Sequence, residues 1–453
     1  MNKLIKTLTL AFFVLGMILA SSLNATAHVQ VQTKSQAVPA TIKVGVLAAI
    51  SGDLESIGAG VTDGIKAAAL EINSSTTMGF KVALSIQDSK ADPTTAVSAY
   101  ETLKAQGVQL IIGATASAAS KAVAEKTATD HIVQISYSST ASSLTNSSYD
   151  YFYRTVPSDA FQAQAFNALI NHYNYTNIVI VNRGDAWGSG LATGLNDLFT
   201  NVSGHTVADT VTYPDGTTDF SSVVTSVKAA TGAQAIADIS FTEDGRSLVT
   251  ELRSSGVTLP IFGVDGTADN SIVNTSIASH SKDDFQAFTG TKPHSDVAGE
   301  DNFNSYVSAL DACKTASICV GNDPTRIYGN YAYDAMWVGA DAVKLAGTYD
   351  GAAIKAKMAE AGASYIGATG NKTFDKYGDP NQATYDIYQF QSGNLTVIGT
   401  WNPSTGVVLN SKAESVTWPG RSSSTPGFDG VTLLFGIAVI AILPVIRKKI
   451  KKY

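Results

Sequence analysis

Hydroxyl and carboxyl side chains follow three apolar, β-forming segments of this sequence, at the point where each segment ends. They are Ser117 after 108–113, Ser138 and Thr140 after 132–136, and Asp265 after 259–264. Ser117 falls at the start of an expected helix, where free N–H groups favour an anion, although a plain helix cap is the more ordinary role for such a residue. Ser138 and Thr140 also suit a turn, and Asp265 could cap a helix near Asp269. The chemistry on offer is recognition of a small charged ligand.

The elements that would position these residues alternate between strand and helix. The segment 42–50 has the pattern of a buried strand, and apolar residues then recur at helical spacing from Val61 to Ile72. Asp92 and Pro93 suit the start of the next helix. A second series of the same kind begins after Pro157. Repeated strand-helix-strand units predict two α/β lobes with parallel sheets, and ligands bind beyond the carboxyl ends of such strands.

Length and composition agree with two lobes and exclude some functions. The chain has 453 residues, too many for one ordinary core, and 15% of them are charged, with a net charge of −7. No basic footprint for nucleic acid is present. Residues 1–27 carry two lysines, an apolar run and a small-x-small end, which predicts a signal peptide and export.

The other end predicts attachment to the membrane. A Ser-rich linker over 411–427 leads into 428–453, where an apolar run precedes a basic tail. We expect either a transmembrane anchor that holds the body outside the cell or a segment similar to archaeal sorting signals, which are exchanged for a lipid. Asn-x-Ser/Thr sites along the chain fit a glycosylated surface protein.

Neither a metal site nor a catalytic site is indicated. Cys313 and Cys319 are the only cysteines and predict a small disulfide loop, and the histidines lack ligand spacing. Gly58, Gly60 and Gly64 imitate a dinucleotide fingerprint with the wrong spacing. We therefore expect no cofactor and no enzyme activity.

Four motifs, in order, resemble the type I solute-binding proteins of branched-chain amino acid ABC importers. They are IKVGVLAAISG, DSKADPTTAV, IIGATAS and FGVDG. The resemblance implies two Rossmann-like lobes joined by a multi-strand hinge, with the ligand in the cleft between them. Lobe one is expected over 42–157 and 286–368, and lobe two over 158–285 and 369–410.

The resemblance also assigns roles to individual residues. Ser117 and Thr140 would bind the α-carboxylate of an amino acid, a carbonyl of Ser138 would bind its ammonium group, and Asp265 would oppose that positive charge. The remaining positions that would line the ligand are the aromatic residues Trp187, Phe241 and Tyr333, and Ile57, which stands where the family has an aromatic residue.

The implied function is capture of an amino acid, with an apolar or branched side chain, for a membrane permease and its ATPase. Several departures, among them Tyr137 where the family usually has proline, leave an amide, urea or a small carboxylate open as the ligand. A surface sensory protein with the same fold is the alternative function.

Overall fold

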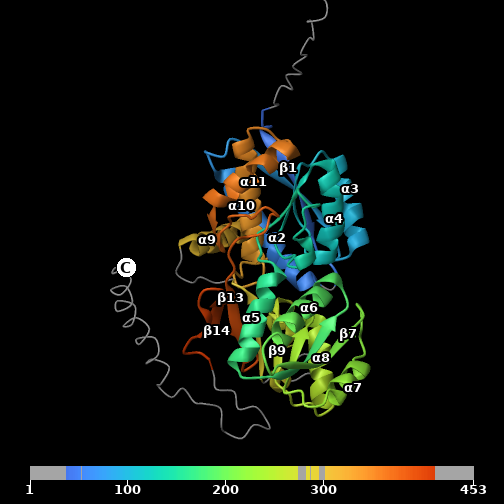
Figure 1. The fold of residues 1–453 in the computed structure, drawn as a ribbon. Coiled ribbons are helices and arrows are strands. Elements are labelled where there is room, and N and C mark those ends of the chain that lie inside the picture. The colour runs from blue at the N-terminus through green and yellow to red at the C-terminus, as the bar shows by residue number, and fades with distance from the viewer. Residues whose placement is uncertain (1–36, 53, 274–281, 286, 295–300, 414–453) are drawn as a thin grey trace, which may run out of the picture. The chain divides into compact units, whose positions relative to one another are not determined.

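The computed structural model of the protein describes residues 37–413 except 53, 274–281, 286 and 295–300 (Figure 1). The expected signal peptide over 1–27 and the expected anchor over 428–453 lie outside these residues, as does most of the linker. Among the described residues, no helix combines the length and the apolar character that crossing a membrane would require.

Lobe one is built on a five-stranded parallel sheet in the order β2-β1-β3-β4-β5. Its strands are β1 (Thr41–Ala48), β2 (Lys81–Asp88), β3 (Leu110–Gly113), β4 (Val133–Ser136) and β5 (Phe152–Arg154). Its helices are α2 (Glu55–Ser74), α3 (Pro93–Ala105), α4 (Ser117–Asp130), α9 (Asp301–Thr315), α10 (Gly329–Ala346) and α11 (Gly351–Ser364). Helices α3 and α4 pack together, and α10 packs against both α2 and α11.

Lobe two is built on an eight-stranded sheet in the order β15-β14-β13-β10-β9-β8-β6-β7. Its strands are β6 (Asn177–Arg183), β7 (Thr206–Tyr213), β8 (Ala235–Ile239), β9 (Ile261–Gly263), β10 (Phe288–Pro293), β13 (Tyr385–Gln391), β14 (Asn394–Asn402) and β15 (Gly406–Leu409). Its helices are α5 (Asp159–His172), α6 (Ala186–Thr200), α7 (Ser221–Ala229) and α8 (Thr242–Ser254). Strands β6 to β10 are parallel to one another, and β13, β14 and β15 follow, each antiparallel to the strand before it in the sheet.

The expected boundary at residue 286 is wrong. Strand β10 pairs with β9 and β13, so residues 288–293 belong to the sheet of lobe two. The chain then stays with lobe one beyond residue 368: the short strands β11 (Ile366–Gly367) and β12 (Gly370–Asn371) pair with each other, and Asp379 pairs with Arg154 at the end of β5. Strand pairing between distant segments decides both boundaries, and local periodicity carries no information about it.

The glycines of α2 allow close packing and do not form a phosphate-binding loop. A Cβ atom at Gly58 would lie 1.8 Å from the Ala49 carbonyl oxygen, and one at Gly64 would lie 2.1 Å from that of Gly329. These glycines bring α2 against the end of β1 and against α10. The resemblance to a dinucleotide fingerprint is therefore explained by packing.

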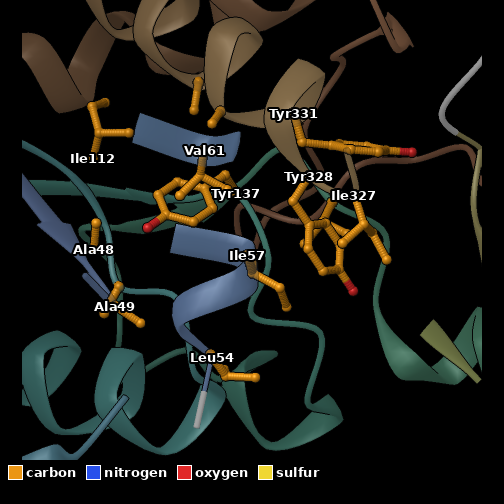
Figure 2. Close-up of a cluster of buried hydrophobic side chains, with 14 of the residues drawn as sticks. Ala48, Ala49, Leu54, Ile57, Val61, Ile112, Tyr137, Ile327, Tyr328 and Tyr331 are labelled. Atoms are coloured by element: carbon orange, nitrogen blue, oxygen red, sulfur yellow. The ribbon is translucent and has the colours of Figure 1, made fainter. Parts of the chain in front are cut away.

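A buried apolar cluster fills the space between α2 and the ends of the strands in lobe one. Figure 2 shows Tyr137, Val61 and Ile112 in this cluster, with Ile57 and Leu54 at the first turn of α2. The Tyr137 hydroxyl donates to the Leu47 carbonyl at 3.0 Å and lies 2.8 Å from the Thr115 hydroxyl. Tyr137 thus connects the ends of β1, β3 and β4, beside which the expected site residues lie.

Candidate functional site

A small cavity lies between the polar ends of β3 and β4 in lobe one and the starts of α6 and α8 in lobe two. Seven of the eight expected ligand residues line it: Ile57, Ser117, Ser138, Thr140, Trp187, Phe241 and Asp265. Its volume is about 20 Å³, enough for a water molecule and too little for an amino acid. A ligand of that size enters only if the walls of the cavity separate.

The hydroxyl groups of the lobe-one wall hold its loops in place. The Ser138 hydroxyl donates to the Thr115 carbonyl at 2.7 Å, and the Ser117 hydroxyl accepts from the Ala141 N–H at 3.2 Å. Ala116, not Ser117, is the N-cap residue of α4, and no side chain caps this helix. Its first-turn N–H groups therefore remain for an anionic ligand, and the positive end of the helix dipole favours one.

Asp265 places a buried carboxyl group on the opposite wall. It lies in the short 3₁₀ helix Asp265–Thr267 and is 3% exposed. Its carboxylate accepts a hydrogen bond from Gln162 at 2.9 Å and one from the hydroxyl of Tyr328, which comes from lobe one. Burial raises the pKa of Asp265, and these two donors partly offset the effect. Asp269, rather than Asp265, caps the next 3₁₀ turn, through a hydrogen bond from the Ser271 N–H at 2.7 Å.

Two stacked aromatic rings form the lobe-two wall. The centroids of Trp187 and Phe241 are 4.7 Å apart, with an angle of 15° between the rings. The guanidinium group of Arg183 lies 4.6 Å from the Phe241 centroid. Three carboxylates hold this guanidinium group, from Asp185, Asp215 and Asp244. The aromatic wall is therefore supported from behind by a fixed cation.

Tyr333 does not contribute to the cavity, contrary to expectation. It lies within α10, where its hydroxyl donates to Glu71 of α2. Tyr328, just before α10, lines the cavity instead, beside Ile57 (Figure 2). Tyr328 has a φ of 66° and is the N-cap of the helix, so its side chain leaves the helical pattern that leads to Tyr333. Helical spacing in the sequence cannot identify such a residue.

The loop that carries Thr140 is held by Arg154, a residue that was not among those expected at the site. The Arg154 side chain is fully buried, and one of its terminal nitrogens donates to the carbonyls of Ser139 and Ala141, at 3.0 and 3.1 Å. Its other nitrogens form a two-point contact with Asp379, at 2.6 and 2.9 Å. In the sequence, the only indication of this role was a single arginine at the end of an apolar strand.

No cluster of three or more His, Cys, Asp or Glu side chains with metal-binding geometry occurs among the described residues. Cys313 and Cys319 form a disulfide, and the Cys319 sulfur lies 3.3 Å from the Asp63 carbonyl of α2. The disulfide fixes the loop before Tyr328 against α2.

Comparisons with known proteins agree with this geometry. A Leu/Ile/Val-binding protein homologue of Brucella melitensis is 23% identical over 365 residues, which cover 79% of this chain and 93% of that protein. The substrate-binding protein of a branched-chain amino acid transporter from Streptococcus pneumoniae, solved with isoleucine, has a TM-score of 0.70 at 22% identity and covers 80% of this chain and 100% of that one. An ABC transporter solute-binding protein of R. palustris, solved with benzoate, has a TM-score of 0.68 at 16% identity, with 82% and 98% covered.

The expected α/β fold of two lobes is confirmed by these structures. The family model for periplasmic binding proteins matches residues 41–394, which span both sheets and the cavity between them. The chain belongs to the periplasmic binding protein family.

Proposed function

We propose that this protein captures a free amino acid outside the cell and delivers it to the permease of an ABC importer. The observation that carries the proposal is the pairing of opposite recognition groups across one cavity. The uncapped N-terminus of α4 and the loop of Ser138 and Thr140 suit a carboxylate, and buried Asp265 suits an ammonium group. A zwitterion would satisfy both walls and limit the cost of desolvating either charge.

Ligand capture would proceed by closure of the lobes. The amino acid first engages Ser117 and Thr140 in lobe one, and lobe two then brings Trp187, Phe241 and Asp265 against it. Contacts with both lobes exist only in the closed form, so the ligand shifts the population toward closure. The aromatic wall and Ile57 would surround an apolar side chain. The expected signal peptide and C-terminal anchor would hold the protein at the outer face of the membrane.

An aromatic carboxylate is the second candidate ligand, because the stacked Trp187 and Phe241 offer a flat surface to a ring. It is the weaker candidate: a benzoate-like ligand would leave Asp265 buried without a cation, and would bring its own negative charge close to it. A sensory protein that presents the same closed form to a partner receptor is the alternative biological role.

Calorimetric titration of the purified protein tests the proposal. The panel contains leucine, isoleucine, valine, phenylalanine, neutral amides and benzoate, added after unfolding and refolding to remove carried ligand. We expect micromolar or tighter binding of an aliphatic amino acid. Binding of benzoate or amides alone would retire the amino-acid assignment.

Asp265→Ala tests whether Asp265 recognises the ammonium end of the ligand. The substitution should weaken the binding of leucine by about 1.5 to 3 kcal/mol, the range for hydrogen bonds to charged groups. It should weaken the binding of 4-methylpentanoate, which lacks the ammonium group, much less. Asp269→Ala is the matched control, because Asp269 caps a 3₁₀ turn and does not line the cavity. Equal losses for leucine and 4-methylpentanoate would exclude the ammonium role of Asp265.

A further inference from the structure

A second carboxyl group, that of Asp159, lies behind the cavity in an unusual state for an acidic residue. Asp159 is the first residue of α5 and is 1% exposed. Neither of its carboxylate oxygens has a hydrogen bond of normal geometry to any described residue. An acidic residue in the first turn of a helix is ordinarily solvated and needs no partner. A buried carboxylate without a hydrogen bond of normal geometry costs several kcal/mol, so the charged form of Asp159 is disfavoured.

Asp159 is linked to the ligand-binding residues on two sides. Its backbone N–H donates to the Thr140 carbonyl at 2.8 Å, and the Thr140 hydroxyl interacts with its carboxyl group. One turn further along α5, Gln162 donates to Asp265 at 2.9 Å. Thr140 and Asp265 both line the cavity. Asp159 is therefore bracketed by the residues of the two opposite walls.

The charges around Asp159 do not neutralise it. Burial raises its pKa well above the usual range, and the negative charges of Asp265 and Asp185 raise it further. Arg154 is the cation that lowers it, and Arg154 is already engaged by Asp379 and two carbonyls. Tyr328 and Tyr385 also face this group. Burial and the nearby acidic groups raise the pKa of both hydroxyls, so both stay neutral. Two carboxyl groups in such surroundings cannot both ionise easily.

We propose that Asp159 and Asp265 share one proton in the free protein and that an ammonium ligand releases this proton to the solvent when it binds. This inference rests on the proposed function. The ligand's positive charge replaces the proton as the partner of the second carboxylate, so one cation enters as one proton leaves. The amino acid keeps its own charges, and no bond other than O–H is broken.

The proposal predicts a definite pH dependence. While the free pair holds its proton and the bound pair does not, each unit of rising pH should strengthen leucine binding by up to about tenfold. Above the higher pKa of the free pair, no proton is left to release, and the affinity becomes constant. The same ligand without an ammonium group, 4-methylpentanoate, should release no proton, because its own carboxylate gives the pair no cation.

Titration in buffers of different ionisation enthalpy measures this release directly. The slope of the observed binding enthalpy against the buffer enthalpy gives the protons exchanged per ligand. At pH values above the ordinary range of an aspartate and below the higher pKa of the free pair, we expect release toward one proton for leucine with the natural protein, and none with Asp159→Asn. The affinities of the two proteins should converge in acid and differ about tenfold or more at the alkaline end. Asp197→Asn, an exposed acid on α6, is the charge-matched control and should behave as the natural protein.

Each outcome has a separate meaning. Leucine binding without proton release by the natural protein would overturn the shared proton and leave the proposed function standing. Release that persists in Asp159→Asn would assign the proton to another group and also overturn the inference. If Asp159→Asn fails to fold, the comparison of leucine with 4-methylpentanoate on the natural protein still decides. Failure of every amino acid to bind would overturn the proposed function and this inference together.

Discussion

At the scale of single residues, Gly266 sets the fit between Asp265 and the aromatic wall. A Cβ atom at this position would lie 2.4 Å from the Ser240 carbonyl oxygen, 2.8 Å from the Trp187 ring and 3.1 Å from Phe241. Gly266→Ala should therefore displace the stacked rings, cost about 1 to 3 kcal/mol of stability and weaken ligand binding. Urea unfolding and calorimetric titration measure the two effects.

Gly190 supplies the control in lobe two, because it lies on the helix that carries Trp187 but does not line the cavity. It lies within α6, and a Cβ atom there would have no neighbour within 4 Å. Gly190→Ala should stabilise the helix by about 0.5 to 1 kcal/mol and leave binding unchanged. If Gly266→Ala and Gly190→Ala had the same stability and the same affinity for the ligand, the Gly266 backbone would not be in close contact with the aromatic wall.

Asp238, the residue before the last one of β8, should make the stability of the protein depend on pH. Its side chain is fully buried, and burial raises its pKa to about 7, although the Ser240 hydroxyl lowers it. Between the unfolded value and 7, the folded protein holds a proton that the unfolded chain has lost, so stability falls as pH rises and levels off above 7. Asp238→Asn should match the natural protein in acid and exceed it above pH 7, by a few kcal/mol at most, in urea unfolding.

Asp88 supplies a control of the opposite sign. It is partly buried, and its carboxylate accepts hydrogen bonds from Ser51 at 2.6 Å and from the N–H groups of Ile50 and Lys90. Despite burial, these donors lower its pKa. Its contribution is present above the unfolded pKa and is lost as pH falls, so Asp88→Asn should destabilise the protein at neutral pH and less so in acid. If the stabilities of Asp238→Asn and Asp88→Asn changed with pH in the same way, the opposite pKa shifts assigned to Asp238 and Asp88 would be contradicted.

At the scale of elements, the Arg154–Asp379 pair connects the loop that carries Thr140 to the segments that pass between lobes. Arg154 ends β5, Asp379 lies between β12 and β13, and the carbonyls that Arg154 binds flank Thr140. Arg154→Met would leave Asp379 buried without its partner and should cost about 3 to 5 kcal/mol of stability. Arg154→Lys keeps the charge without the planar fork, so affinity should fall more than stability. Unchanged affinity in Arg154→Lys would show that the loop keeps its shape unaided.

The ion pair between Lys355 and Asp150 is the matched control for that experiment. Their side chains are 30% and 50% exposed, so solvent screens the attraction between them. Lys355→Met should change stability by about 1 kcal/mol or less and leave affinity unchanged. Unfolding in urea and titration with leucine, applied to both positions, separate a buried pair from a surface pair.

Elements were predictable from sequence where local chemistry determines them. The expected helix after Asp92 begins at Pro93, and the Asp92 carboxylate accepts the Thr95 N–H at 2.7 Å, as a cap should. The assignment of β10 to lobe one was wrong, because strand pairing depends on distant segments. Asp159 had the pattern of a normal helix start, and only its burial under neighbouring elements distinguishes it. Local patterns locate elements, whereas partners and burial come from tertiary contacts.

At the scale of the whole molecule, the chain passes from one lobe to the other three times, after β5, after β10 and after β12. Hydrogen bonds accompany these passages: the Thr155 hydroxyl donates to the Tyr331 carbonyl at 2.9 Å, and the Tyr331 hydroxyl donates to the His294 carbonyl at 2.9 Å. Three connections allow a hinge motion and resist twisting or sliding. Ligand binding should therefore close the lobes along a single path.

Closure should appear in both the size and the stability of the protein. A ligand in contact with both lobes binds only when both are folded, so leucine at 100 times its Kd should add about 2.7 kcal/mol to the free energy of unfolding. It should also merge any separate unfolding steps of the lobes into one, and reduce the radius of gyration in solution scattering. Asp265→Ala at the same leucine concentration should show smaller changes in all three. Stabilisation of one step alone, without a change in size, would mean that the ligand contacts a single lobe and that capture does not involve closure.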